Sequence, residues 1–169
     1  CDNQHKAIWL ASRSWGYRLD SMHKAANNEP PPIAEHWLTL SEVLDWMVED
    51  KLVEPAEAER LKKERRNYRN AVHPLVSVAD QKWKLPQQPH RTLGIEFLTE
   101  WLAKRVGMEY IHIDPLKIDF SAVTEVMSSA YATRFRILSL GVTHKEAMIA
   151  TSEPYVREWE KVLAPIIKR

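Results

Sequence analysis

Residues 135–154 read FRILSLGVTHKEAMIATSEP, and this stretch decides the fold class that the sequence predicts. Phe, Ile and Leu dominate residues 135–140, as they do in β-strands, and Gly141 begins a segment that is able to turn. Residues 147–151 then return as the partner strand. Residues 152–154, Ser-Glu-Pro, are typical of a helix start, because each of these residue types is favoured near the first turn. The stretch therefore predicts a strand hairpin followed by a helix.

The residues before this hairpin predict further elements of both kinds. The apolar side chains of residues 93–106 recur at helical spacing, and Gly107 follows them as a left-handed cap. Residues 108–115 alternate as a short strand that ends at a proline. A short helix is expected at about 121–129, and residues 130–134 connect it to the hairpin. Helix, strand, helix, hairpin and helix in this order predict an α+β arrangement.

The front of the chain predicts helices only. Apolar residues and alanines at helical spacing indicate a helix over residues 6–26. A second helix is expected to begin near Thr39 or Ser41, with a hydroxyl cap at Ser41 and an apolar stripe. Proline and acidic residues at 54–57 open a third helix, which is expected to run to about Asn70.

These patterns divide the chain into three predicted parts. Residues 1–72 form a helical subdomain, and residues 93–169 form an α+β subdomain. Three separate prolines interrupt residues 73–92, which we therefore expect to be a Pro-rich linker. The predicted fold class is α+β, with a helical N-terminal half followed by a small sandwich of a short mixed sheet and flanking helices.

The composition fits an ordinary globular protein. The chain has 169 residues, of which 44% are hydrophobic and 28% are charged. A net charge of +1 does not favour a polyanionic partner, so we expect no nucleic acid. No apolar run approaches the ~20 residues that span a bilayer, so we expect no membrane insertion. Cys1 is the single cysteine, which favours a reducing compartment. Since the chain begins without Met, we expect it to be part of a longer polypeptide.

The sequence contains no recognisable catalytic motif. Its four glycines are far apart and form neither a phosphate-binding loop nor a dinucleotide fingerprint. Its seven histidines lack the spacing of a metal site, and a single cysteine cannot complete one. We therefore expect no catalytic residue, no metal and no resident cofactor, and hence a chain that is not itself an enzyme. A small enzyme of another type is the alternative.

Three blocks of the back half resemble a known bacterial family. They are residues 97–113, with a Leu-Ala pair, Gly107 and a tyrosine before a short strand, residues 132–138, with an arginine-bearing turn, and residues 147–154, with a strand that leads to a proline. In this order they resemble the N-terminal domain of type II secretion and type IV pilus assembly ATPases, over roughly residues 93–165. Ser139 stands where that family often has proline.

The resemblance implies a role next to a motor. In that family the domain precedes the ATPase core on the same polypeptide and attaches the hexameric motor to the cytoplasmic domain of an inner-membrane platform protein. The phosphate-binding loop is then expected beyond Arg169. The expected location is the cytoplasm, peripheral to the bacterial inner membrane. Both a secretion system and a pilus system fit the resemblance.

Exposed aromatic and arginine side chains are the expected contacts with such a partner, because these residue types dominate interface hot spots. The candidates are Trp37, Trp46, Arg65, Arg66 and Arg69. The three arginines lie in the basic tail of the third predicted helix. An alternative interpretation of that tail is a solvated helix end, where basic residues interact favourably with the helix dipole.

A second function is implied by the same family, because some members bind cyclic di-GMP. Their tandem helical motifs begin with Arg-Leu-Gly and close with Gln. Residues 41–65 resemble one copy, but Glu42 and Leu44 stand at its Arg and Gly positions. In the second copy Arg91 lies one residue away from the expected place, and Arg105 stands at the Gln position. Arg91 and Arg105 are therefore the candidate nucleotide contacts of a cyclic di-GMP sensor.

Overall fold

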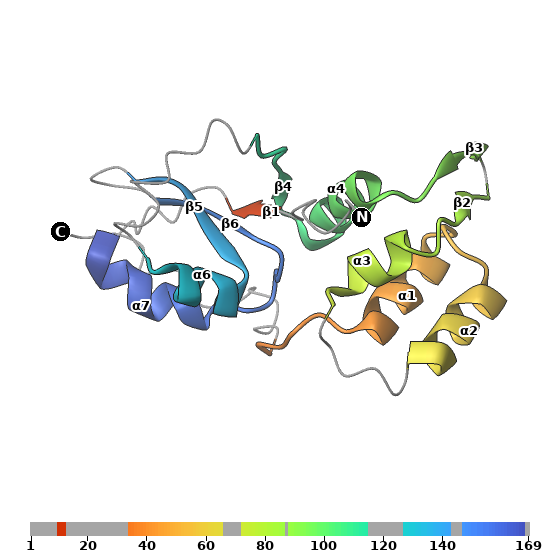
Figure 1. Ribbon diagram of the computed structural model, residues 1–169, viewed down its shortest axis with the longest axis horizontal. Coiled ribbons are helices and arrows are strands. Elements are labelled where there is room, and N and C mark those ends of the chain that lie inside the picture. Colours follow the sequence, from red (N-terminus) through yellow and green to blue (C-terminus); the bar gives the residue numbers. More distant parts are fainter. Residues whose placement is uncertain are drawn as a thin grey trace, which may run out of the picture. The chain divides into compact units, whose positions relative to one another are not determined.

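The structure is a computed structural model, and it combines helices with short antiparallel sheets (Figure 1). It describes residues 10–12, 34–65, 72–86, 88–114, 127–142 and 147–167. These residues form two compact units. Unit 1 lies within Leu38–Arg105, and unit 2 lies within Trp9–Trp37 and Val106–Arg169. The predicted α+β class, with a helical N-terminal part, is confirmed.

Unit 1 is built from four helices and one small hairpin. Its elements are α1 (Leu40–Glu49), α2 (Pro55–Arg65), α3 (Pro74–Ala79), β2 (Lys84–Leu85), β3 (Gln88–Thr92) and α4 (Ile95–Val106). Helix α1 begins after Thr39, whose Oγ1 accepts a hydrogen bond from the Glu42 N–H at 3.2 Å. The helix therefore begins where the sequence predicts, but its hydroxyl cap is Thr39 and not the expected Ser41, whose hydroxyl donates to Asp45 at 3.4 Å.

The core of unit 1 is formed by the apolar stripes of its helices. Helix α1 packs against α2 and α3. The largest fully buried side chains are Val43, Leu44, Met47, Leu61, Leu75, Leu93, Leu98 and Leu102. Helix α4 ends as predicted, because Gly107 adopts the left-handed conformation with φ of 69°. The hairpin joins this core through the Leu93 N–H, which donates to the Trp83 carbonyl at 2.8 Å.

Residues 73–92 do not form the expected linker without regular structure, because they contain α3, β2 and β3. Pro74 occupies the first turn of α3, where proline needs no hydrogen-bond partner. The ring Nδ1 of His73 caps the helix by accepting the Leu75 N–H at 3.2 Å. The prolines therefore begin elements here as well as interrupting them. The division into 1–72, 73–92 and 93–169 as separately folding parts stays a prediction.

Unit 2 contains a four-stranded sheet in the order β4-β1-β6-β5. Its elements are β1 (Leu10–Ser12), β4 (Glu109–Tyr110), α6 (Ser129–Phe135), β5 (Ile137–Val142), β6 (Ala147–Thr151) and α7 (Glu158–Ile167). The pairs are all antiparallel, whereas the sequence predicted a mixed sheet. The β5–β6 hairpin is confirmed, and Ile137 pairs with Thr151 at its open end.

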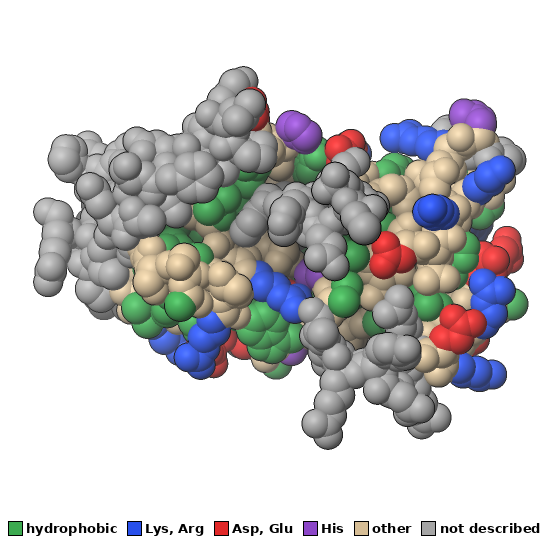
Figure 2. All heavy atoms as spheres, in the orientation of Figure 1, with side chains coloured by type: hydrophobic (Ala, Val, Ile, Leu, Met, Phe, Trp, Pro, Cys, Tyr) green, Lys and Arg blue, Asp and Glu red, His purple; other side chains and the backbone are tan. Residues whose placement is uncertain are grey.

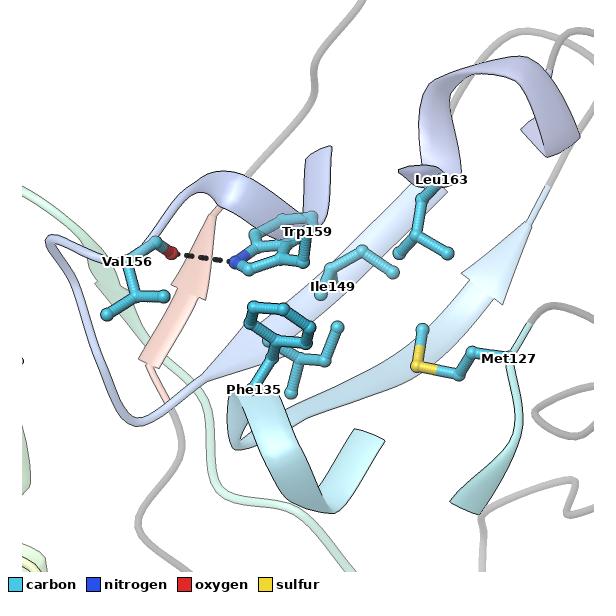
Figure 3. Close-up of a cluster of buried hydrophobic side chains, with 7 residues drawn as sticks. Met127, Phe135, Ile149, Val156, Trp159 and Leu163 are labelled. Carbon is cyan, nitrogen blue, oxygen red and sulfur yellow. Dashed lines mark hydrogen bonds between the residues drawn. The ribbon is translucent and has the colours of Figure 1, made fainter. Parts of the chain in front are cut away.

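The core of unit 2 is a cluster of apolar side chains from α6, α7 and the β5–β6 hairpin. Its members are Met127, Phe135, Ile137, Ile149, Val156, Trp159 and Leu163. Figure 3 shows Phe135, Ile149 and Trp159 of this cluster facing one another between the helices and the strands. The indole Nε1–H of Trp159 donates to the Val156 carbonyl at 2.8 Å, so this buried ring has its polar atom satisfied. Both helices therefore cover the same face of the sheet.

Several predicted elements differ from the structure. Leu10–Ser12 is a strand, although a helix was predicted over 6–26, because these residues pair with β4 and β6. The short helix predicted at 121–129 does not end at 129, because α6 begins there. The predicted connector 130–134 is therefore helical. Ser128 caps α6 by accepting the Tyr131 N–H at 3.3 Å. Residues 121–126 lie outside the described part.

Three remaining differences concern element boundaries. The strand predicted over residues 135–140 begins at Ile137, because Phe135 ends α6 and Arg136 caps that helix. The strand predicted over 108–115 is confined to Glu109–Tyr110, within the described residues up to Asp114. The last helix begins at Glu158 rather than at 152–154. At residues 152–153 no helix begins, because both residues interact with Arg136. The Ser152 N–H donates to the Arg136 carbonyl, and the Glu153 side chain accepts a hydrogen bond from the Arg136 guanidinium.

Replacing Trp159 tests the core of unit 2. Trp159→Ala removes a ring that is 7% exposed and should lower the free energy of unfolding by about 3–5 kcal/mol. Trp159→Phe should cost less, because most of the apolar volume remains. The matched control is Val162→Ala in the same helix, where the side chain is 51% exposed. Urea unfolding measures all three, and equal midpoints for Trp159→Ala and Val162→Ala would contradict the assignment.

Candidate docking surfaces

The first candidate surface, the Arg105 cluster, joins the ends of two helices in unit 1. It consists of Trp46, Glu49 and Asp50 at the end of α1 and of Trp101 and Arg105 in α4. The Arg105 guanidinium donates to Asp50 at 2.9 Å and forms a second ion pair with Glu49. It also lies 5.2 Å from the centre of the Trp46 ring. The indole Nε1–H of Trp101 donates to the other Asp50 oxygen at 2.7 Å.

Electrostatics explain why this cluster holds together. Glu49 and Asp50 follow one another at the C-terminal end of α1, where the helix dipole disfavours negative charge. Arg105 offsets this from the last turn of α4, where a positive charge is favourable. Burial lowers the pKa of Arg105, but the hydrogen bonds that its guanidinium donates to Glu49 and Asp50 outweigh this effect, so that the pKa is raised. The guanidinium therefore stays charged and occupied by two carboxylates.

The rest of the surface of α1 and α2 is a field of mixed charge, and Figure 2 shows positive and negative side chains interspersed over it. The Lys62 ammonium group donates to Asp45 at 2.6 Å and to Glu59 at 2.8 Å, and these hydrogen bonds raise the pKa of Lys62. Exposed pairs of this kind contribute little to stability. The charged side chains of this face are solvated and do not define a binding site.

The second candidate surface, the Trp37 cluster, lies in unit 2 and consists of His36, Trp37, Arg136, Glu153 and Tyr155. The Trp37 side chain is 45% exposed, and the Arg136 guanidinium lies 5.5 Å from its ring centre. The ring of His36 stacks on that of Tyr155, with 4.8 Å between centres and 16° between planes. The segment before α1 is thereby attached to the turn between β6 and α7.

A buried carboxylate anchors the Trp37 cluster. Glu153 is 1% exposed, and its Oε1 accepts a hydrogen bond from Arg136 Nη1 at 2.5 Å. The Glu153 N–H donates to Thr151 Oγ1 at 3.0 Å, which fixes the turn that carries the carboxylate. A buried charge without a partner is costly, so this ion pair determines the position of the arginine.

The backbone of Arg136 is held as firmly as its side chain. Arg136 caps α6 in the left-handed conformation, with φ of 52° and ψ of 47°. Its N–H donates to the carbonyls of Ala132 and Thr133, and its carbonyl accepts the Ser152 N–H at 3.1 Å. A residue with a side chain adopts this conformation at a cost of ~1 kcal/mol, which these bonds and the ion pair offset.

The predicted site residues are distributed over both units. Trp37 is exposed in unit 2, whereas Trp46 and Arg105, which the sequence assigned to different roles, contact each other in unit 1. Arg91 is exposed in β3, with its guanidinium 5.0 Å from the centre of the Phe97 ring. Arg66, Arg69 and the side chain of Arg65 lie outside the described part. Their predicted roles stay predictions.

The sequence analysis missed the partners that position these side chains. Arg136 was placed inside a strand and Glu153 at a helix start, so neither was considered as half of an ion pair. The available signal was the hairpin itself, because pairing residues 137 and 151 brings the residues just outside them together. Asp50 and Trp101 carried no comparable signal, since 51 positions separate them.

Among the described residues, no cluster of three or more His, Cys, Asp or Glu side chains is placed to hold a metal ion. Within the same ranges, none of the helices has the length and apolar character needed to cross a bilayer.

Removing Arg105 tests its structural role. Arg105→Ala should lower the free energy of unfolding by about 1–2 kcal/mol, from the lost ion pairs and the lost contact with Trp46. The control Lys104→Ala removes a side chain that is 74% exposed and should lower the free energy of unfolding by a few tenths of a kcal/mol. Thermal unfolding at low and high salt measures both, and the Arg105 effect should shrink with salt. Equal effects of the two variants would contradict this role.

Breaking the Arg136–Glu153 pair from one side tests the anchor of unit 2. Arg136→Gln removes this cation from the buried Glu153 carboxylate and should cost about 2–3 kcal/mol, less than for a fully buried pair because the arginine is 31% exposed. The double variant Arg136→Gln with Glu153→Gln removes both charges and should recover part of this loss. Denaturant unfolding of the single and double variants measures the loss of stability and its partial recovery. A double variant no more stable than the single one would contradict the pairing.

Comparison with known proteins supplies one clear relative. The chain is 38% identical over 97 residues to the type IV pilus assembly ATPase TfpB of Acinetobacter baylyi. The aligned part covers 55% of this chain but 17% of that protein. No protein-family model matches the chain. No solved structure matches it either. The resemblance stated from the sequence is confirmed at this level: the chain carries a region related to the pilus and secretion ATPase family.

Proposed function

We propose that this chain is a non-catalytic docking region of a bacterial type IV pilus assembly or type II secretion ATPase. The observation that carries the proposal is its 38% identity to a pilus assembly ATPase over 17% of that protein. A region so small relative to the motor, in a chain without a phosphate-binding loop, is suited to an accessory role. We propose as its partners the ATPase domain of the same polypeptide and the cytoplasmic domain of the inner-membrane platform protein.

Two features of the structure support a docking role rather than a catalytic one. The described residues present an exposed tryptophan beside a fixed arginine, which is the composition of an interface hot spot. The arginine beside that tryptophan, Arg136, is held in position by the buried Glu153 carboxylate. Such a group suits recognition of a partner surface. The proposed location is accordingly the cytoplasmic side of the inner membrane, where the platform protein holds the motor.

The alternative proposal is a cyclic di-GMP sensor in the same motor family. Arg91 favours it, because its guanidinium is exposed beside Phe97 and is able to contact a phosphate or a base. Arg105, the second candidate contact, already pairs with Glu49 and Asp50. A dinucleotide would have to displace these carboxylates, and this makes docking the better supported proposal.

Calorimetry on the whole motor protein separates the two proposals. The ATPase that carries this chain is titrated with the platform protein's cytoplasmic domain and, separately, with cyclic di-GMP. We expect saturable micromolar binding of the platform domain and no heat from the nucleotide. The control is the same ATPase without residues 1–169, which should keep ATP hydrolysis and lose the platform domain. Undiminished platform binding by this truncated protein would contradict the docking proposal.

A further inference from the structure

We propose that the Trp37 cluster is a recognition site for an acidic segment of a partner protein. In this inference, which rests on the proposed docking function, Arg136 and Arg134 bind side-chain carboxylates of the partner. Trp37 contacts an apolar side chain next to them. The inference names the chemistry of the partner at the point of contact.

The exposed indole is the first argument. Four large hydrophobic side chains are exposed among the described residues, and Trp37 is the aromatic one among them, at 45%. One face of the ring is covered by the guanidinium of Arg136, so the ring is oriented rather than free to rotate. An oriented tryptophan loses little conformational entropy when a partner binds, and such residues dominate interface energies.

The second argument is the set of free donors on Arg136. The guanidinium has five N–H donors, and within the described residues one hydrogen bond uses them, from Nη1 to Glu153. The Nε and Nη2 hydrogens make no hydrogen bond to those residues, and the side chain is 31% exposed. Parallel N–H groups of this kind match both oxygens of a carboxylate. The buried Glu153 holds this fork in place before any partner arrives.

The third argument is the local charge. Glu153 neutralises one positive charge, but Arg134, two residues before Arg136, is exposed and lies 5.3 Å from the Phe135 ring centre. Both Arg134 and Glu158 act on the pKa of the neighbouring Tyr131, so Glu158 offsets part of the Arg134 charge. The guanidinium groups of Arg134 and Arg136 are nevertheless complementary to acidic side chains. Two arginines are few for a phosphate polymer or a lipid surface, which argues for a protein segment.

The experiment uses the full-length ATPase and two probes. One probe is the platform protein's cytoplasmic domain, and the other is a peptide of alternating glutamate and leucine, with a glutamine-for-glutamate peptide as its control. Trp37→Ala should weaken binding of both acidic probes about tenfold. The double variant Arg136→Gln with Glu153→Gln should do the same and also reduce the salt dependence of binding. Lys161→Gln and Val162→Ala, exposed positions in the same unit, should leave binding unchanged.

The outcomes separate this inference from the proposed function. If neither Trp37→Ala nor the double variant weakens binding of the platform domain, the proposed docking function is retained. The Trp37 cluster is then not the binding site. Binding of the acidic peptide through Trp37 without binding of the platform domain supports the site and removes the proposed partner. Three further results would also overturn the site. The glutamine peptide binds as well as the acidic peptide, neither probe binds, or the protein binds anionic phosphatidylglycerol vesicles and not the peptide. Trp37→Ala replaces a half-exposed side chain, and a melting curve checks that it folds.

Discussion

The buried carboxylate of Glu153 is the constraint on which unit 2 depends. At 1% exposure it requires a cation, and Arg136 supplies one from just before the neighbouring strand, at the same, open end of the β5–β6 hairpin. The same arginine ends α6 in a left-handed conformation and accepts the Ser152 N–H, so a helix, a strand and a turn meet at one residue. The apolar cluster around Trp159 supplies the burial energy, but the ion pair fixes how the elements connect.

Unit 1 uses the same principle with less burial. Its core is a set of leucines and a methionine in packed helices, which defines no unique angle between α1 and α4 by itself. The polar contacts of Asp50 with Trp101 and Arg105 add direction to that packing. Because these charges are partly exposed, they contribute modestly to stability and mainly to specificity. The two units thus share a design in which an arginine joins elements distant in sequence.

Local patterns in the sequence were sufficient for the elements but not for these junctions. The stripe of α1, the end of α4 at Gly107 and the β5–β6 hairpin are all encoded by neighbouring residues, and all were predicted correctly. Leu10–Ser12 was predicted as helix because its strand conformation depends on pairing with β6, almost 140 residues away along the chain. The ion pairs share this property, since their partners are 17 to 56 positions apart.

The candidate sites show what this separation means for function. Tryptophans and arginines are visible in the sequence as potential interface residues, but their roles depend on which acids they meet. Arg105 meets two carboxylates and becomes a structural residue. Arg136 meets one, below an exposed tryptophan, and keeps donors for a ligand. The difference between a scaffold arginine and a recognition arginine is therefore a count of satisfied donors, which is a property of the fold and is not encoded in any local motif.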